Sequence, residues 1–133
     1  MKLTTRSEYA LLALIYLGRN QTDGPIASAR IAEAQKIPLK YLEQIMSAMQ
    51  RSGYVSSIKG QHGGYRLARN PSEISLAQVI RLFDGALAPT ESVSKYFYKA
   101  TPLEKEQKMI DVLREVRDFI AQKLETTTLA DLL

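Results

Sequence analysis

The chain has 133 residues, the size of one domain, and can bury on the order of two thirds of its unfolded surface in a core. It contains no cysteine, which excludes disulfides, thiolate metal sites and cysteine nucleophiles and fits a reducing compartment. Residues 1–70 hold ten Lys and Arg against four Asp and Glu, a net of +6, whereas residues 71–133 hold eight against ten, a net of −2. The basic half predicts an acidic partner such as nucleic acid, with an ordinary solvated basic surface as the alternative.

The chain shows no sequence signal for a membrane. Its longest apolar run, Tyr9–Leu17, is too short to span a bilayer, and no cleavable signal pattern opens it. We therefore expect a soluble, cytoplasmic protein without a membrane partner.

The first predicted helix runs from about Arg6 to Arg19. Thr5 and Glu8 have the spacing of a capping box, in which a hydroxyl and a carboxylate satisfy free N–H groups reciprocally. The middle of this helix is apolar nearly all round, so we expect other helices or a second subunit to surround it. A turn follows, and Ser28 is then predicted to cap a short helix over Ala29–Gln35, with Ile31 and Ala32 facing inward.

A third helix follows after a short turn, from about Leu39 to Ser52, with Pro38 in its first turn and Gly53 at its end. Its apolar residues recur at i, i+3, i+4 and i+7 and predict one buried stripe: Leu42, Ile45, Met46 and Met49. The opposite face carries amide, hydroxyl, phenolic and charged groups: Lys40, Tyr41, Glu43, Gln44, Ser47 and Arg51. Such groups hydrogen-bond base edges and phosphates, so the pattern predicts the recognition helix of a helix-turn-helix.

A short β-hairpin is predicted directly after this helix. Tyr54–Ile58 and Tyr65–Leu67 are β-prone, and the glycine-rich segment between them is typical of a tight tip. Lys59 and Arg66 place positive charge on the hairpin, where DNA phosphates attract it. Together with the preceding helices this predicts a winged helix-turn-helix; the alternative is an ordinary hairpin with solvated lysines.

The remaining chain predicts two more helices around an irregular segment. Ser75 is predicted to cap a helix that ends at Gly85. Its apolar stripe consists of Leu76, Val79, Ile80 and Phe83, and we expect it to pack on the helix at Arg6–Arg19. Residues 86–100 have no clear period. Their aromatic residues 96–98 are interpreted as packing against the long helix or a partner subunit, or as a contact for an effector or partner protein. Thr101–Glu104 has the pattern of a capping box that opens the longest helix, which reaches about Leu124.

The stripe on this longest helix is wider than a solvated helix needs. It consists of Met109, Val112, Leu113, Val116, Phe119, Ile120 and Leu124. We expect it to bury against something large, either within the chain or across a two-fold axis.

The sequence resembles the winged-helix regulators related to the iron–sulfur cluster regulator IscR, the nitric-oxide sensor NsrR and the cysteine-metabolism repressor CymR, the Rrf-two family. The matching residues are Tyr41-Leu42-Glu43-Gln44, Gly53 and Gly63-Gly64-Tyr65, extended by the runs 1–6, 9–10 and 127–132. The resemblance implies a mainly α fold with a small β-hairpin wing and a long C-terminal dimerisation helix. Residues 1–85 would form the DNA-binding domain and residues 86–133 the loop and dimerisation helix, as a single compact unit. The terminal segment resembles a short capped helix that closes the dimer.

The resemblance also implies double-stranded DNA as the partner and a set of contacts to it. Lys40, Tyr41 and Gln44 would contact bases, with Glu43 discriminating between them. Lys59, Gly60, Gly63, Gly64 and Tyr65 would form the wing. Lys2, Thr4, Arg6 and Arg51 would mainly bind phosphates. Lys40 replaces a small polar residue and Lys59 an arginine that are usual in the family, and lysine lacks the guanidinium fork needed to read a minor groove.

In cluster-binding members of the family three cysteines lie within the region of residues 86–100, where this chain has Ser92 and Ser94. We therefore expect no iron–sulfur cluster, no metal and no cofactor, in a member nearer the CymR branch. The first hypothesis is a homodimeric repressor on pseudo-palindromic promoter sites. The second is a regulator whose DNA binding is controlled by a partner enzyme or a small-molecule effector that docks on the dimer.

An enzyme is poorly supported by the sequence. The single histidine, His62, lies in the glycine-rich turn with no acid nearby in the chain, and is expected to be a solvated or phosphate-near wing residue. We therefore predict no catalytic residues.

Overall fold

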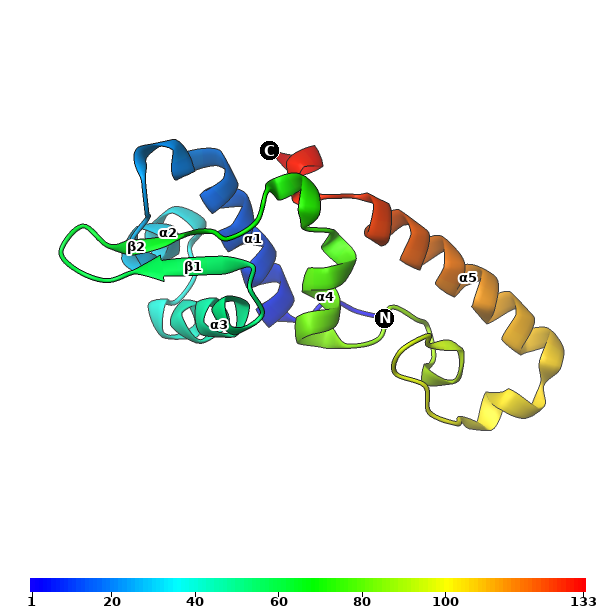
Figure 1. Ribbon diagram of the computed structural model, residues 1–133. Helices are drawn as coiled ribbons and strands as arrows, with labels where there is room; N and C mark the ends of the chain where they lie inside the picture. Colours follow the sequence, from blue (N-terminus) through cyan, green and yellow to red (C-terminus); the bar gives the residue numbers. More distant parts are fainter.

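The computed structural model describes residues 1–133, with every side chain except that of Asp23. Three helices and a hairpin form one body, and a long helix lies at a distance from them on the far side of a fourth helix (Figure 1). The segment that follows the long helix leads back to the first body, so the C-terminal end of the chain lies beside it (Figure 1). Within the described chain no helix is long and apolar enough to cross a membrane.

The first body is built from α1 (Thr5–Asn20), α2 (Ser28–Gln35) and α3 (Leu39–Arg51). All four predicted stripe residues of α3 are buried, and they share one core with Leu14 and Leu17 of α1 and with Ile31 of α2. The predicted boundaries of α3 and the inward orientation of Ile31 and Ala32 are confirmed. The burial of α1 is one-sided: Ala10, Ala13, Leu14 and Leu17 are buried, whereas Leu12 is exposed.

The helices α1 and α2 each begin one residue earlier than predicted, and the capping residues of all three helices differ from the prediction. Thr4, not Thr5, caps α1, because its hydroxyl oxygen accepts a hydrogen bond from the N–H of Ser7 (3.3 Å). Glu8 is then one position too late for the predicted capping box. Ser28 is the first residue of α2 and caps nothing, and Pro38 precedes α3 at the capping position.

The wing is an antiparallel pair, β1 (Val55–Ile58) and β2 (Gly64–Leu67), with Val55 opposite Leu67 and Ile58 opposite Gly64. A third segment joins it: the N–H groups of Ile26 and Tyr65 each donate to the other residue's carbonyl oxygen at 2.8 Å. The chain between α1 and α2 thus pairs with β2 through an isolated bridge and connects the wing to the helix-turn-helix. The predicted hairpin is confirmed, and its additional partner at Ile26 was not predicted.

The helix α4 (Leu76–Asp84) lies between the two parts of the fold and packs on α1 as predicted. Its capping box is complete: the Ser75 hydroxyl oxygen accepts from the Gln78 N–H (3.2 Å), and the Gln78 side chain accepts from the Ser75 N–H (3.0 Å). Gly85 ends the helix with φ of +81°.

The predicted capping box at Thr101–Glu104 is wrong. Residues Pro102–Lys105 form a 3₁₀ turn, Glu106 leaves the helical region, and α5 begins only at Gln107 and ends at Thr126. The two capping side chains have other partners: the Thr101 hydroxyl donates to Ser92 Oγ (2.8 Å), and the Glu104 carboxylate accepts a hydrogen bond from the Tyr98 hydroxyl. Tertiary contacts therefore replace the local cap.

The last residues form the predicted short capped turn, Leu129–Leu132, with Thr128 and Asp131 as its capping box. It packs on the first body of its own chain. The Leu129 N–H donates to the Ile74 carbonyl (2.8 Å), the Leu76 N–H to the Thr127 carbonyl (3.0 Å), and Arg19 Nη2 to the Leu132 carbonyl (3.1 Å). This intramolecular role was missed by the sequence-based prediction, which gave the segment a role in closing a dimer.

The two hairpin glycines Gly64 and Gly60 provide a matched test of the wing's attachment. A Cβ at Gly64 would lie 2.3 Å from the backbone of Ile26, whereas a Cβ at Gly60 would meet nothing within 4 Å; both residues have positive φ. We expect Gly64→Ala to lower the free energy of unfolding by about 1–3 kcal/mol more than Gly60→Ala, because only Gly64 also suffers overpacking. Urea denaturation measures both, and equal losses would contradict the close approach.

Candidate nucleic-acid interface

The outward face of α3 carries a group of exposed polar side chains. Lys40, Tyr41, Glu43, Gln44 and Arg51 are exposed, while the four stripe residues on the other side are buried. Rotation of the helix about its axis would place charged side chains in the core, which is costly without a partner. The packing of α3 therefore fixes which side chains face solvent.

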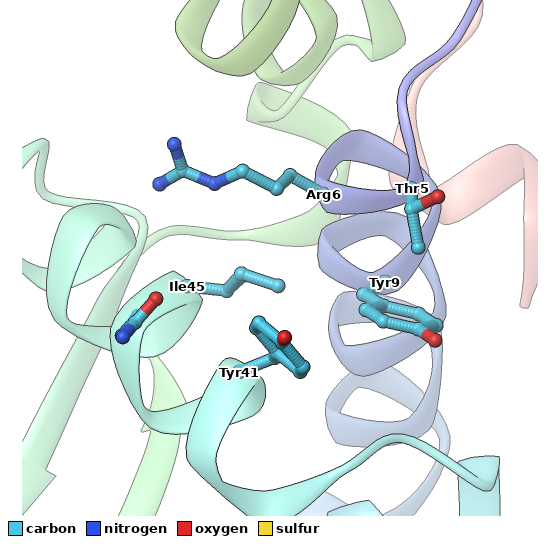
Figure 2. A pocket seen from close by; sticks show the side chains of 6 residues that line it. Thr5, Arg6, Tyr9, Tyr41 and Ile45 are labelled. Atoms are coloured by element: carbon cyan, nitrogen blue, oxygen red, sulfur yellow. The ribbon is translucent and has the colours of Figure 1, made fainter.

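Arg6 of α1 joins this face. An open groove is lined by Arg6, Lys40, Glu43, Gln44, Ser47 and Arg51, and a hollow of about 470 Å³ lies beside it between α1 and α3. Figure 2 shows Arg6 extending from α1 over this hollow, with Tyr41 and Ile45 on the α3 side and Tyr9 on the α1 side. Arg51 Nη1 donates to Ser47 Oγ at 2.8 Å, which orients the guanidinium along the helix. Three cations and one carboxylate thus share one groove with an amide.

The tip of the wing is exposed and basic. Lys59, Gln61, His62 and Arg66 are all exposed, which agrees with the predicted solvated position of His62. Gly63 permits the tight turn, because a Cβ there would lie 2.0 Å from the Ile58 carbonyl oxygen. Gly60, Gly63 and Gly64 therefore shape the wing, and the neighbouring cations supply its charge.

Tyr65 lies in β2 of the wing, as predicted, and its ring faces the helical body. Its ring is partly buried against the main core, and its backbone pairs with Ile26 and lies opposite Ser57. Tyr65 thus holds the wing on the helical body, and a contact between DNA and the exposed part of its side chain stays a prediction.

Thr4 and Lys2 are the other two predicted phosphate ligands, and their neighbours lie in other parts of the chain. The Thr4 hydroxyl donates to the Asp84 carboxylate, so it has no hydrogen left to donate to a phosphate. Lys2 lines two hollows on the other side of α4, one with Asp84 and Phe97 and one with Phe119 and Lys123. Arg6 and Arg51 are thus the predicted phosphate ligands that the structure places beside α3.

Arg69 was missed by sequence reasoning. Its Nε donates to the Gly53 carbonyl (3.1 Å) and its Nη2 to the Ser52 carbonyl (3.3 Å), and its guanidinium lies 4.6 Å from the centre of the Tyr54 ring. It therefore caps the C-terminal end of α3 from the far end of β2. Gln50 adds a second link, from its Nε2 to Ser57 Oγ of β1 (3.0 Å). No local sequence pattern predicts these contacts of Arg69, because its partners become neighbours only when the hairpin folds back on α3.

The predicted dimerisation stripe on α5 divides into two parts. Leu113, Ile120 and Leu124 are partly buried and pack against clusters of their own chain around Val93, Ile110 and Ile80. The other four remain exposed, to 46% at Met109, 54% at Val112, 41% at Val116 and 75% at Phe119. The intramolecular alternative thus accounts for one edge of the stripe and leaves an apolar face in solvent.

The aromatic residues of the 86–100 loop are also exposed. Tyr96 lies under the guanidinium of Arg81, 4.8 Å from ring centre to Cζ, and the Phe97 N–H donates to Ser94 Oγ (3.0 Å). The hydrogen bond that Tyr98 donates to the Glu104 carboxylate raises the pKa of the Tyr98 phenol above its ordinary value. Tyr96 and Phe97 line a small hollow with Arg117 and Ala121 of α5, so packing within the chain covers part of these rings and leaves the rest exposed.

Residues 3–133 match the family described as Rrf2, iron-dependent transcriptional regulator. The chain belongs to the Rrf2 family. It is 31% identical over 132 residues to the HTH-type transcriptional regulator CymR of Bacillus subtilis, which covers 99% of this chain and 89% of CymR. It is 39% identical over 95 residues to the regulator IscR of Aliivibrio salmonicida, covering 71% of this chain and 56% of that protein.

Solved structures of Rrf2 proteins have the same fold. The structure of CymR, the global cysteine regulator of B. subtilis, superposes with a TM-score of 0.85 at 30% identity and covers 99% of this chain and 95% of that one. The structure of T. potens IscR gives 0.77 at 29% identity, with 99% and 85% covered. The predicted winged-helix fold is confirmed. The protein is a DNA-binding transcription regulator and not an enzyme.

The residues of this chain do not fit the iron–sulfur cluster that the resemblance associates with part of the family. There is no cysteine to supply thiolate. Ser92 and Ser94 are buried in the corresponding region, where Ser92 Oγ accepts from Thr101 and Ser94 Oγ from the Phe97 N–H. Both hydroxyl groups therefore have a structural partner, and among the described side chains no three His, Asp or Glu residues gather as a metal site.

The importance of Arg69 for holding α3 can be measured without DNA. We expect Arg69→Met to lower the free energy of unfolding by about 1–3 kcal/mol, because two hydrogen bonds and a cation–π contact are lost. Arg66→Met, at an exposed arginine of β2, is the control and should change the free energy of unfolding by less than about 0.5 kcal/mol. Chemical denaturation compares the two, and equal effects would argue against the cap on α3.

Proposed function

We propose that the protein is a homodimeric, cytoplasmic repressor that occupies pseudo-palindromic promoter DNA without an iron–sulfur cluster. The observation that carries the proposal is the exposed polar face of α3, bordered by Arg6 and fixed by the buried stripe behind it. Such a helix fits the major groove, where side-chain amides and cations distinguish base pairs.

Within each half-site, Lys40, Tyr41 and Gln44 contact base edges. The Glu43 carboxylate accepts from a cytosine amino group and is repelled by phosphate elsewhere, which adds discrimination. Arg6 and Arg51 flank these residues in the same groove and neutralise phosphates, which fixes the register. Lys59 after the end of β1 and Arg66 in β2, which lies opposite Ser56, contact the backbone of the adjacent groove.

The dimer forms through the exposed part of the α5 stripe: Met109, Val112, Val116 and Phe119. A second copy of the same face would bury it, as two-fold symmetry requires of an isologous interface. Two α3 helices would then lie about one helical turn apart on DNA, roughly 34 Å. Residues 1–85 form the DNA-binding unit in this scheme, and residues 86–133 the dimerisation unit.

A second candidate is control of this DNA binding by a partner protein or small molecule on the dimer. The observation that favours it is the exposure of three consecutive aromatic side chains, Tyr96, Phe97 and Tyr98. The two candidates differ in whether purified protein binds its operator tightly alone. Selection from random duplex DNA at physiological salt, with no ligand added, tests this: an enriched pseudo-palindrome supports the first candidate, and only salt-sensitive non-specific binding supports the second.

The assignment of Gln44 to base readout predicts a position-specific effect. On the selected operator, Gln44→Ala should weaken binding by about 1–3 kcal/mol and relax the preference at one base pair of each half-site, because one side-chain contact is lost. Gln122→Ala, at an exposed glutamine of α5, is the control and should change neither. Competition with single-base operator variants measures the preference, and an unchanged profile would remove Gln44 from the reading face.

The assignment of α5 to dimerisation predicts that a charge on its exposed stripe separates the subunits. Val116→Glu should convert the dimer to monomer and weaken operator binding at least about 100-fold, since a carboxylate would be buried in an apolar interface. Gln122→Glu places the same charge on the polar side of α5 and should leave the dimer intact. Sedimentation equilibrium gives the mass, and a Val116→Glu protein that remains dimeric would refute this interface.

A further inference from the structure

The end of α4 is bound to the beginning of α1 through one carboxylate. Asp84 Oδ2 accepts a hydrogen bond from the Thr4 N–H (3.2 Å) and lies 2.7 Å from Ser7 Oγ, and its Oδ1 accepts from the Thr4 hydroxyl. Ser7 is fully buried, so its hydroxyl has no access to water as an alternative partner. Asp84 therefore joins two residues of the first turn of α1 to a helix some 80 positions later in the chain.

Phe83, the residue before Asp84, contacts the side chain of Arg6 in the first turn of α1. Phe83 lies beneath the Arg6 guanidinium, with 5.5 Å from Cζ to the ring centre. The last two residues of α4 thus hold the backbone of the first turn of α1 and the cation that projects from it. Arg6 in turn lines the groove with Lys40, Gln44 and Arg51.

The negative charge of Asp84 affects α4, α1 and DNA binding differently. A carboxylate at the C-terminal end of α4 is unfavourable for that helix, whereas at the N-terminal end of α1 it is favourable. A negative charge near a DNA-binding surface also opposes binding in the absence of a specific role. The contacts with Thr4 and Ser7 compensate for these costs, because hydrogen bonds to an ionised carboxylate are charge-assisted.

We propose that Asp84 is a positioning residue for DNA binding, which holds the first turn of α1 so that Arg6 lies beside α3 and reaches a phosphate. This inference rests on the proposed role of α3 and Arg6 at the operator. Asp84 itself touches no DNA, and its effect passes through Arg6.

The test is a double-mutant cycle of Asp84→Ala and Arg6→Ala, read as the dependence of operator affinity on salt. Loss of one phosphate contact lowers the slope of log K against log salt by about 0.9, hence by roughly 1.8 for a dimer. We expect Arg6→Ala and Asp84→Ala each to lower the slope by this amount and to weaken binding about tenfold. The double variant should match Arg6→Ala, because the contact is lost only once.

Two further variants separate positioning from other effects. Glu91→Ala removes an exposed carboxylate from the same hollow as Asp84 and should leave the slope unchanged and the affinity equal or slightly higher. Asp84→Asn keeps the shape of the side chain and serves if the alanine variant does not fold; it should shift the slope in the same direction. Circular dichroism and titration of the active fraction confirm that each variant is folded.

Specific outcomes would overturn the inference. If Asp84→Ala and Asp84→Asn bind more tightly than the wild type, the carboxylate acts only by its charge. If they keep the wild-type slope, or if their losses add fully to that of Arg6→Ala, Asp84 does not act through Arg6. If Arg6→Ala and Gln44→Ala themselves leave operator binding unchanged, the proposed function fails first, and the cycle distinguishes this case.

Discussion

Burial of the apolar stripe of α3 against α1 is the constraint on which the rest of the DNA-binding surface depends. Leu42, Ile45, Met46 and Met49 are all buried, and each contributes roughly 1.5–3 kcal/mol relative to exposure. Because these residues lie on one side of a regular helix, their packing sets the rotation of α3 about its axis. The side chains available to DNA follow from what the core requires.

The wing is positioned by contacts of a different kind. Close backbone approach at Gly64, the paired hydrogen bonds between Ile26 and Tyr65, and the two bonds from Arg69 to the end of α3 set its angle. These contacts require a specific geometry, whereas the helical core is stabilised largely by the apolar surface area that it buries. α3 and the wing are therefore joined by direct contacts, and the backbone at Ile26 between α1 and α2 pairs with β2 through an isolated bridge.

Periodic patterns predicted the helices well because they report burial directly. The α3 stripe and the α4 cap at Ser75 were predicted from the sequence and are confirmed. Predictions of local caps were less reliable. Thr101 and Glu104 have the spacing of a capping box, yet their side chains form hydrogen bonds with Ser92 and Tyr98. The same limitation applies to the site, where Thr4 is bound to Asp84 and Tyr65 packs inward. Arg69 could not be predicted, since its partners become neighbours only after the hairpin has folded.

The return of the C-terminal turn to Ile74 has a consequence for how the chain folds. The bond between Leu129 and Ile74 closes a loop of about 55 residues, which carries α4, the irregular segment and the long helix. Most contacts of the helix-turn-helix and hairpin join residues that are nearer in sequence, so their closure costs less entropy. The contact at Leu129 therefore carries a larger closure entropy than the contacts within the helix-turn-helix and hairpin.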